Sequence, residues 1–407
     1  MNKKRIIGLT FPENTGDSRL EPPVLTVLSG IENAEYCFKD NNHIADDEEI
    51  EYYACTVYSS GYHQFKEWSK NRNKNKIIVG GYHPTTCPDE FEGYAHKTVV
   101  GQCDSFFKTI QQEGQVVNGI TEYKNIPNYV KYNYKVNHLI LPGVNEDDVC
   151  TSINTGIGCP YNCEFCCSPI MSNKIISKPL VLVEKEVEYL KSIHANYLFI
   201  KDENLPLHKD WKERLAIIKR TGAKLILFSS SNLLLKNNTI ETLKKNNVYM
   251  VSIGIDNINS PTIKNKNIET AINKLKEYKI YAGLDFIVDS ESIVTENART
   301  EFYTRLLEVF KWLKPEMVSG TFLVPFKGTT LWNKYSSKVN ENDYVFYNGK
   351  TAFLIKNNEL REKIHFDMFW YQWLYFTSEL YNTKVRHFFI EDTLHKKFME
   401  LYRYFVK

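Results

Sequence analysis

Short apolar runs alternate with longer helical or polar stretches along the first part of the chain. The apolar runs cover residues 5–11, 50–58, 76–81 and 97–101. Helical patterns lie between them over residues 22–34, 61–73 and 103–113. This rhythm is typical of a parallel sheet with helices on both faces. We therefore expect a Rossmann-like, doubly wound α/β domain over residues 1–120.

A second series of the same kind begins near residue 149. It has six strand candidates, over 149–155, 196–202, 224–230, 248–255, 280–288 and 317–324. Helical patterns separate them, over 179–193, 208–221, 238–247, 267–278 and 296–313. Six strands that alternate with helices predict an open (β/α)6 barrel of the TIM type over residues 149–330. Functional groups in such barrels gather at the carboxyl ends of the strands.

The remaining segments have other patterns. Residues 121–148 carry Pro, Gly and Asn without a clear period, which indicates a linker. Residues 331–407 are helical by pattern, and the stretch 364–381 is strongly aromatic. We interpret this stretch as a buried packing helix, with a wall of the substrate pocket as the alternative.

Composition and charge narrow the class of protein. The chain has 407 residues, 43% hydrophobic and 25% charged, as is ordinary for a soluble globular protein. The formal net charge is +2, without the excess of basic residues that is typical of nucleic-acid-binding proteins, so nucleic acid is not an expected partner. The apolar part of the first residues is too short for a signal peptide, and the aromatic stretch 366–376 is too short for a membrane span. We expect a cytoplasmic protein.

Candidate chemistry lies directly after the first strand of the second series. Cys159, Cys163 and Cys166 form a C-x3-C-x2-C array. Three close thiolates suit a [4Fe-4S] cluster that leaves its fourth iron open to a small molecule. The alternative is a structural zinc site, with Cys150 or Cys167 as the fourth ligand. A disulfide framework fits poorly, because the nine cysteines are an odd number.

The cysteine spacing, with Phe165 before the last thiolate, resembles that of radical S-adenosylmethionine (SAM) enzymes. Further stretches resemble one subgroup, which carries an N-terminal cobalamin-binding-type domain. They lie at 20–34, 77–91, 99–110, 155–169 and 322–332, so the resemblance spans residues 5–335. In this family a reduced cluster cleaves SAM, and the resulting 5′-deoxyadenosyl radical abstracts hydrogen from a substrate.

The resemblance implies roles in the barrel. Cys159, Cys163 and Cys166 would ligate the [4Fe-4S] cluster, and the Phe165 backbone would lie near the adenine of SAM. Asp202 and Glu203 stand where the family holds the SAM amino group, with a solvated strand end as the alternative interpretation.

Five further residues are compared with the family in the same way. Asp256 and Asn257 replace the family's Glu-Ser, and Asp256 is one methylene shorter than Glu. Val324 and Pro325 would pack near the adenine. Ser231 stands where related enzymes often carry Arg.

The resemblance also implies a cobalamin site in the first domain. Gly80, Gly81, His83 and Thr85 would line the groove for the nucleotide tail, although a lone His after Gly-Gly is otherwise a turn residue bonded to backbone. The family's cobalamin-ligating Asp-x-His-x-x-Gly motif is replaced by residues 12–23, which contain no histidine. No such histidine would therefore coordinate the lower face of cobalamin.

The leading functional hypothesis is a cobalamin-dependent radical SAM methyltransferase that acts at an unactivated carbon. A second hypothesis is a cobalamin-independent radical SAM enzyme that performs rearrangement, cyclisation, oxidation or sulfur insertion. A third is a non-catalytic, metal-stabilised binding protein. We expect an external one-electron donor of the flavodoxin or ferredoxin type. The sequence leaves open whether the substrate is a small molecule, a peptide or a nucleotide.

Overall fold

A computed structural model describes residues 4–11, 34–38, 50–126, 148–256, 266–347 and 349–377 of the chain. The chain divides into two compact units. The first comprises residues 1–137, 149–223 and 325–348, and the second comprises 138–148, 224–324 and 349–407. The domain boundaries inferred from the sequence stay a prediction.

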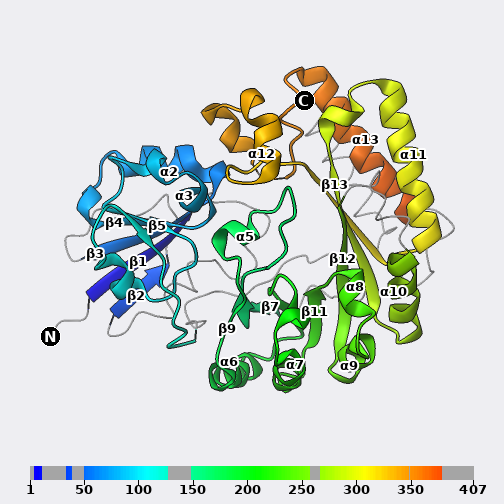
Figure 1. The fold of residues 1–407 in the computed structure, drawn as a ribbon, viewed down its shortest axis with the longest axis horizontal. Helices are drawn as coiled ribbons and strands as arrows, with labels where there is room; N and C mark the ends of the chain where they lie inside the picture. Colours follow the sequence, from blue (N-terminus) through cyan, green and yellow to red (C-terminus); the bar gives the residue numbers. More distant parts are fainter. Residues whose placement is uncertain are drawn as a thin grey trace. The chain divides into compact units, whose positions relative to one another are not determined.

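The first sheet is parallel and belongs to the first unit (Figure 1). Its strands run in the order β2-β1-β3-β4-β5-β6. Their bounds are β1 Lys4–Phe11, β2 Ala34–Phe38, β3 Ile50–Val57, β4 Ile77–Gly80, β5 Lys97–Val100 and β6 Val116–Asn118. The chain direction across the sheet reverses between β1 and β3, and ligands of such sheets bind at the carboxyl ends of the strands near that reversal.

Helices and short turns cover the first sheet. They are η2 Ser59–Gly61, α2 Tyr62–Ser69, η3 Lys74–Lys76, α3 Tyr82–Thr86, η4 Pro88–Phe91 and α4 Phe106–Ile110. One part of the core joins Ile6, Ala54, Ile78 and Val99 of the strands to Phe106 of α4. The apolar runs are thus buried on both sides, as expected for a parallel sheet.

The second sheet has six strands in the order β14-β13-β12-β11-β10-β7. Their bounds are β7 Cys150–Ile153, β10 Tyr197–Ile200, β11 Lys224–Phe228, β12 Val248–Asp256, β13 Tyr281–Val288 and β14 Met317–Phe322. All six predicted barrel strands are present within a few residues of the expected bounds. The predicted α/β fold class is therefore confirmed.

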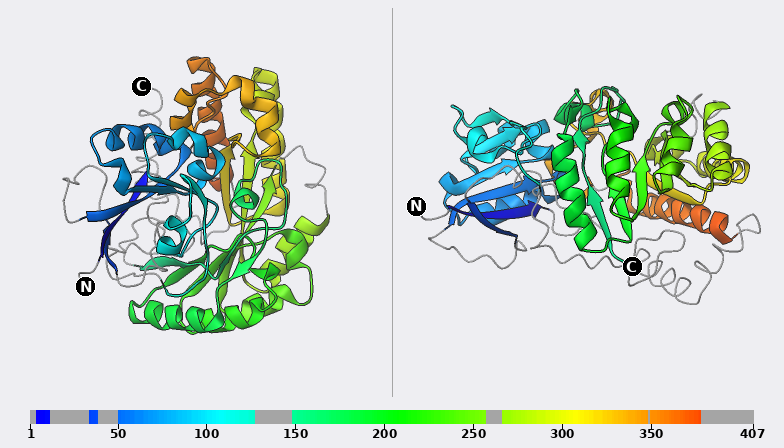
Figure 2. Two further views of the ribbon diagram at one scale, coloured as in Figure 1. Left: turned by 60° about the vertical axis from the view of Figure 1, so that its left-hand side comes forward. Right: turned by 90° about the horizontal axis from the view of Figure 1, so that it is seen from below.

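All the helices of the barrel except the short α8 follow the predicted positions. The barrel helices are α6 Leu180–Ser192, α7 Trp211–Lys219, α8 Ser231–Leu234, α9 Thr239–Lys245, α10 Lys266–Glu277 and α11 Glu296–Leu313, with the turn η8 Ser290–Ile293 before α11. Within the first unit, α6 and α7 lie side by side (Figure 1, Figure 2). Between β7 and α6 the chain forms β8 Gly156–Ile157, α5 Ser168–Met171 and β9 Ile176–Ser177, and η6 Leu205–Leu207 follows β10.

The last described segment is helical, as predicted. It contains α12 Thr330–Tyr335, η9 Ser336–Lys338, η10 Glu341–Phe346 and α13 Asn358–Thr377. In the second unit α13 lies beside α11 (Figure 1, Figure 2), where Arg299 Nε donates to Asp367 Oδ2 at 3.1 Å and Ile364 is buried. This packing supports the interpretation of the aromatic stretch as a packing helix over its described part.

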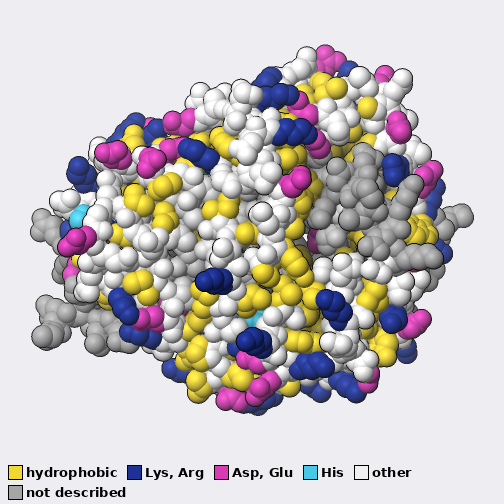
Figure 3. Space-filling model, in the orientation of Figure 1, with side chains coloured by type: hydrophobic (Ala, Val, Ile, Leu, Met, Phe, Trp, Pro, Cys, Tyr) yellow, Lys and Arg dark blue, Asp and Glu magenta, His cyan; other side chains and the backbone are white. Residues whose placement is uncertain are grey.

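The described helices include none that is both long enough and apolar enough to span a membrane. On the face drawn in Figure 3, side chains of Lys and Arg lie interspersed with those of Asp and Glu. This distribution agrees with the near-zero net charge of the sequence.

Three expectations fall wholly or partly on residues outside the description. The predicted helix over 22–34 and the segment 12–23 that lacks histidine belong to this group, as does the linker from 127 to 147. The sequence pattern missed the short strands β2 and β6.

Candidate radical SAM site

The three cysteines follow β8 in the first unit, and the backbone holds their segment at several points. Cys159 is buried, Cys166 is half-buried and Cys163 is exposed. The Cys159 N–H donates to Ser172 O at 3.1 Å, and the Cys166 N–H donates to Cys163 O at 3.1 Å. Near the end of the segment, the Leu331 N–H donates to Glu164 O at 2.9 Å. The thiols therefore stand on a loop with a defined path.

A zinc ion and an iron–sulfur cluster require different distances between the sulfurs of their ligands. A zinc ion with Zn–S bonds of about 2.3 Å would hold its sulfurs about 3.8 Å apart. Among the described residues, one group of ligand atoms lies within 4.8 Å of one another, and it is His83, Cys87 and Glu90, not the three cysteines. The C-x3-C-x2-C order of the three cysteines suits a cluster that leaves one iron open.

Burial controls the protonation of the neighbouring thiols. It raises the pKa of Cys159, against backbone hydrogen bonding from Tyr161 and a side-chain bond from Asn204, which lower it. Burial also raises the pKa of Cys167 to about 12. The other candidate fourth ligand, Cys150, is 1% exposed within β7. Metal ligands must lose their protons, and burial opposes this at Cys159 and at Cys167 alike.

Asp202 and Glu203, at the end of β10, have different surroundings. Asp202 is 1% exposed, and its carboxylate accepts hydrogen bonds from the Thr155 N–H at 2.7 Å and from Thr155 Oγ1 at 2.6 Å. Glu203 instead lines a cavity, and burial raises the pKa of its carboxyl group. Glu203 is therefore the better placed of the two to meet a ligand, and neither residue is a solvated strand end.

The other predicted SAM contacts are described within their own units. Phe165 is half-buried in the cysteine loop, and Pro325 is buried, with its carbonyl accepting from Tyr347 Oη at 3.0 Å. In the second unit Val324 is 8% exposed. Asp256 ends β12, but its side chain and all of Asn257 lie outside the described residues. Ser231 is half-buried at the start of α8.

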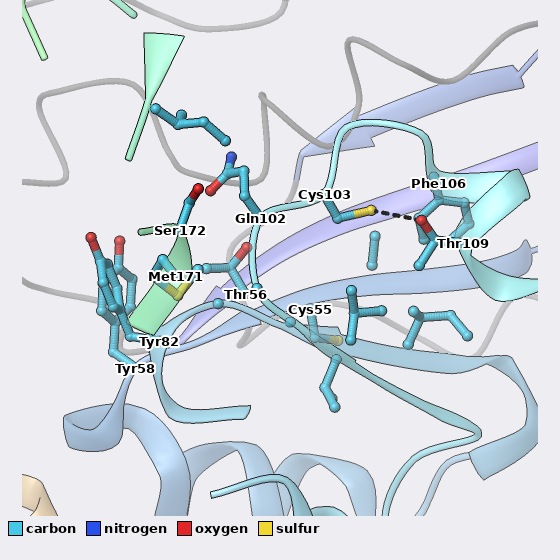
Figure 4. Close-up of a pocket in the computed structure, with 18 of the residues that line it drawn as sticks. Cys55, Thr56, Tyr58, Tyr82, Gln102, Cys103, Phe106, Thr109, Met171 and Ser172 are labelled. Carbon is cyan, nitrogen blue, oxygen red and sulfur yellow. Dashed lines mark hydrogen bonds between the residues drawn. The ribbon is translucent and has the colours of Figure 1, made fainter. Parts of the chain in front are cut away.

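A cavity of about 310 Å³ lies within the first unit, at the carboxyl edge of the first sheet (Figure 4). Its inner wall is apolar and includes Ala54, Ile78 and Val99 from the strands and Phe106 from α4. Its other wall comes from the segment around the cysteines and from the end of β10, with Gly158, Met171, Ser172, Lys201 and Glu203. One cavity is therefore lined both by the first sheet and by the barrel segment that carries the cysteines.

Three glycines at the edge of this cavity allow a ligand to come close to the backbone. Gly80, Gly81 and Gly101 all line it. Gly81 has φ +102°, and a Cβ there would lie 3.0 Å from Thr56 Cγ2. Residues with side chains are strained at such a φ, so this part of the wall is bare backbone.

Two tyrosines flank the cavity on the sheet side. Tyr58 and Tyr82 lie side by side in Figure 4, with ring centroids 6.2 Å apart. Burial raises the pKa of Tyr82, and the nearby charges of Cys167 and Glu203 raise it further. Sequence reasoning singled out neither tyrosine, although Tyr82 lies inside the Gly-Gly-x-His-Pro stretch.

His83 lies away from the cavity that was predicted to include it. It is 1% exposed, with Nδ1 3.0 Å from Ser59 Oγ and Nε2 3.2 Å from Glu90 Oε2. The alternative interpretation, a turn histidine bonded to backbone, is also wrong, because both partners of the His83 ring are side chains. Tyr344 donates to the other Glu90 oxygen at 3.1 Å, and Lys327 Nζ lies 3.6 Å from it. These partners already compensate the Glu90 charge, so the group does not need a metal ion.

Thr85 belongs to a neighbouring cavity of about 450 Å³. Its hydroxyl donates to Gly81 O at 2.7 Å and accepts from the Gly101 N–H at 3.0 Å. Gln102 and Ser172 line both cavities. Of the four residues predicted for cobalamin, Gly80 and Gly81 line the first cavity, Thr85 lines the second and His83 lines neither.

Comparison with known proteins identifies the class. Residues 153–289 match the model of the radical SAM superfamily, and this range includes the three cysteines, Asp202 and Glu203. This segment is therefore similar to the radical SAM domain, whose chemistry uses a [4Fe-4S] cluster and SAM.

Two of its relatives are methyltransferases of Chlorobaculum tepidum. The chain is 23% identical to bacteriochlorophyllide d C-8(2)-methyltransferase over 348 residues, which are 78% of this chain and 75% of that protein. It is 22% identical to bacteriochlorophyllide d C-12(1)-methyltransferase over 291 residues, which are 67% of this chain and 62% of that protein.

Solved structures share the fold. The radical SAM methyltransferase TsrM from Kitasatospora setae, with cobalamin and a [4Fe-4S] cluster bound, has a TM-score of 0.60 and 14% identity, covering 83% of this chain and 78% of its own. TsrM with tryptophan substrate and a SAM analogue also gives a TM-score of 0.60, with 82% of this chain and 76% of its own covered.

Proposed function

We propose that this protein is a cobalamin-dependent radical SAM methyltransferase that acts at an unactivated carbon. Its two Chlorobaculum tepidum relatives are methyltransferases, and the TsrM structure of the same fold contains cobalamin and a [4Fe-4S] cluster. The observation that carries the proposal is the single cavity lined by Gly80 and Gly81 on one side and by Gly158 and Glu203 on the other. Such an arrangement brings two cofactor sites into reach of each other.

The described residues of the cavity fit cobalamin in two respects. The bare backbone at Gly80, Gly81 and Gly101 gives a large planar ring a close approach. The apolar wall between the strands and α4 suits the nucleotide tail. No histidine is among the described lining residues, so an imidazole from this wall would not coordinate the cobalt. When bound, cobalamin would supply a carrier for a methyl group.

On the SAM side, we assign the cluster ligands to Cys159, Cys163 and Cys166, as predicted. With SAM bound, the cluster would supply the electron that cleaves it. Glu203 is then the carboxylate that pairs with the SAM ammonium, because the Asp202 carboxylate is occupied by Thr155. Phe165, Asp256, Asn257, Val324 and Pro325 stay predicted SAM contacts.

The same proposal implies an electron donor and a reducing compartment. The cluster needs an external one-electron donor, for which we propose a protein of the flavodoxin or ferredoxin type. The eight described cysteines are all free thiols, which supports a reducing compartment such as the cytoplasm.

Anaerobic turnover tests the methyltransferase assignment. Cluster-reconstituted protein is incubated with a reductant, SAM and candidate substrates, with and without added cobalamin. We expect 5′-deoxyadenosine, S-adenosylhomocysteine and a substrate that gains about 14 mass units because CH3 replaces H, with the last two products formed only when cobalamin is present. 5′-Deoxyadenosine without S-adenosylhomocysteine would instead support the cobalamin-independent enzyme.

A further inference from the structure

A buried polar network lies beneath the segment that leads into the cysteine loop. Its centre is Asp202, which was predicted to face SAM but is 1% exposed. Three hydrogen bonds converge on its carboxylate. Thr155 provides two of them, and His208 Nε2 lies 3.0 Å from Oδ2. A carboxylate with these partners is used for structure and not for a ligand.

His208 connects Asp202 to the strand on the far side of the loop. Because a carboxylate only accepts, Nε2 carries the hydrogen. The other ring nitrogen, Nδ1, lies 2.7 Å from Ser177 Oγ in β9. Both nitrogens of this 5% exposed ring are therefore engaged, and the ring has one orientation.

Thr155 is held from its carbonyl side as well. Arg214 Nη1 donates to Thr155 O at 2.9 Å, and the Lys178 N–H donates to the same oxygen at 2.8 Å. Arg214 is itself fixed by two bonds to Asp210, at 2.7 and 2.8 Å. All polar groups of Thr155 thus have charged or backbone partners.

The next residues transmit this position to the first cysteine. A Cβ on Gly156 would lie 2.2 Å from His208 Cε1, so the ring of His208 packs directly on the glycine backbone. Gly158 has φ +92°, and a Cβ there would lie 2.1 Å from Lys174 O. The backbone of Gly158 also lowers the pKa of the Glu203 carboxyl group, against the effect of burial, which raises it. Residues 155–159 therefore have little freedom to move.

We propose that Asp202 and His208 form a positioning pair. Through their hydrogen bonds, the two residues fix the backbone path of residues 155–159 and the position of the Glu203 side chain. Asp202 ends β10 immediately before Glu203, so the same carboxylate sets the direction of both the cluster loop and the SAM-pairing side chain. Neither member of the pair touches the cluster or SAM. This inference rests on the proposed roles of Cys159, Cys163, Cys166 and Glu203.

The test compares variants of the full-length protein after anaerobic reconstitution. Asp202→Asn removes the negative charge that Thr155 and His208 contact and replaces one accepting oxygen by an NH2 group, and His208→Phe keeps an aromatic ring but removes both bonds. His208→Gln can still donate to Asp202 and accept from Ser177. His194→Asn is the control, since His194 is exposed in the same unit. The readouts are iron and sulfide per chain and the SAM concentration that half-converts the electron paramagnetic resonance spectrum of the reduced cluster.

Asp202→Asn and His208→Phe are expected to weaken SAM binding by about 10- to 100-fold, as is usual for groups that orient metal ligands. His208→Gln is expected to stay within about threefold of the wild type, and His194→Asn to equal it. Far-UV circular dichroism identifies variants that fail to fold. If Asp202→Asn and His208→Phe both fail, Ser177→Ala replaces them with the same direction of effect.

Two results would overturn the positioning pair. The first is that Asp202→Asn and His208→Phe fold and keep the iron content and the SAM affinity of the wild type. If these two variants do not fold, the same result for Ser177→Ala counts instead. The other is His208→Gln as impaired as His208→Phe, since hydrogen bonding would then not be the cause. A wild-type protein that takes up no iron would overturn the proposed ligands, and the inference with them.

Discussion

Asp202 and Glu203 are neighbours in the chain and carry the same charge, yet their surroundings separate their roles. Hydrogen bonds from Thr155 and contact with His208 occupy Asp202, whereas Glu203 lines the cavity. A polar group that is buried and fully bonded stabilises a structure. A half-buried carboxyl with a raised pKa at a cavity wall is typical of a ligand site.

The cluster ligands can be tested one cysteine at a time. Cys163→Ala is expected to lower iron uptake and to reduce SAM cleavage by at least about 100-fold, because the cluster loses a ligand. Iron and sulfide analysis and 5′-deoxyadenosine formation measure the two effects. Cys167→Ala is the matched control from the same loop, and full iron with full activity is expected. Equal loss in both variants would contradict the ligand assignment.

Glu203→Gln is expected to raise the half-saturating SAM concentration by about 10- to 100-fold, which corresponds to about 1.5–3 kcal/mol for a bond to a charged group. The iron content is expected to stay unchanged. Glu164→Gln, exposed in the cysteine loop, is the control. An unaltered SAM affinity in Glu203→Gln would assign the ammonium to another residue.

The pH dependence of Glu203 follows from its raised pKa. Only the carboxylate pairs with an ammonium, so SAM affinity is expected to rise as the pH increases through that pKa. For stability the sign is opposite. A folded-state pKa above the unfolded value favours the folded protein at low pH, and this contribution is lost as the pH rises through the folded pKa. Titrations of SAM binding across pH values check the first trend, and Glu203→Gln is expected to flatten it.

Sequence reasoning found the three cysteines because they lie within eight residues of one another. It did not find the burial of Asp202, because that depends on the pairing of β7 with β10, which sets Ile153 opposite Ile200. Likewise, the partners of His83 come from Ser59 and Glu90, which no local pattern relates to it. Contacts set by strand register and tertiary packing are beyond periodicity and spacing.

At the scale of elements, the strands of both sheets were predictable where the apolar runs were long. β2 and β6 were missed, since a strand of five or three residues at either edge of the sheet lacks a continuous buried run. The helices α5 and α8 have four residues each, which is shorter than the window that reveals a helical period. These short elements nevertheless shape the segments after β7 and β11.

The loop between β8 and α5 can be tested through its glycine. Gly158→Ala is expected to destabilise the protein by about 2–4 kcal/mol, because strain at positive φ adds to a collision with Lys174 O. Gly222→Ala is the matched control, with φ +80° and no atom within 4 Å of the added Cβ, and a cost of about 1 kcal/mol is expected. Denaturant unfolding and iron uptake are measured for both variants. An equal loss of unfolding free energy in the two would show that Lys174 O moves away from the added Cβ, and would contradict this prediction.

At the scale of the whole molecule, one chain carries a doubly wound sheet and a second six-stranded sheet, and its fold is similar to that of TsrM over 83% of this chain. The first sheet offers a cavity with a bare backbone edge, and the residues after β7 and β10 offer thiols and a carboxylate to the same unit. This combination is what the sequence resemblance implied.

Ligand binding should be visible in the stability of the chain. Cobalamin at about 100 times its dissociation constant is expected to stabilise the protein by about 2.7 kcal/mol and raise the unfolding midpoint by a few degrees. Cobinamide, which lacks the nucleotide tail, is expected to stabilise less, because it leaves the apolar wall at Phe106 uncovered. Thermal scans under anaerobic conditions compare the two, and a midpoint that cobalamin leaves unchanged would speak against binding.

The most direct measurement of the central claim is the ratio of cobalt to iron to protein after anaerobic reconstitution with cobalamin and gel filtration. The account predicts one cobalt and four irons per chain. Four irons without cobalt would contradict the cobalamin site, and zinc in place of iron would contradict the radical SAM centre itself.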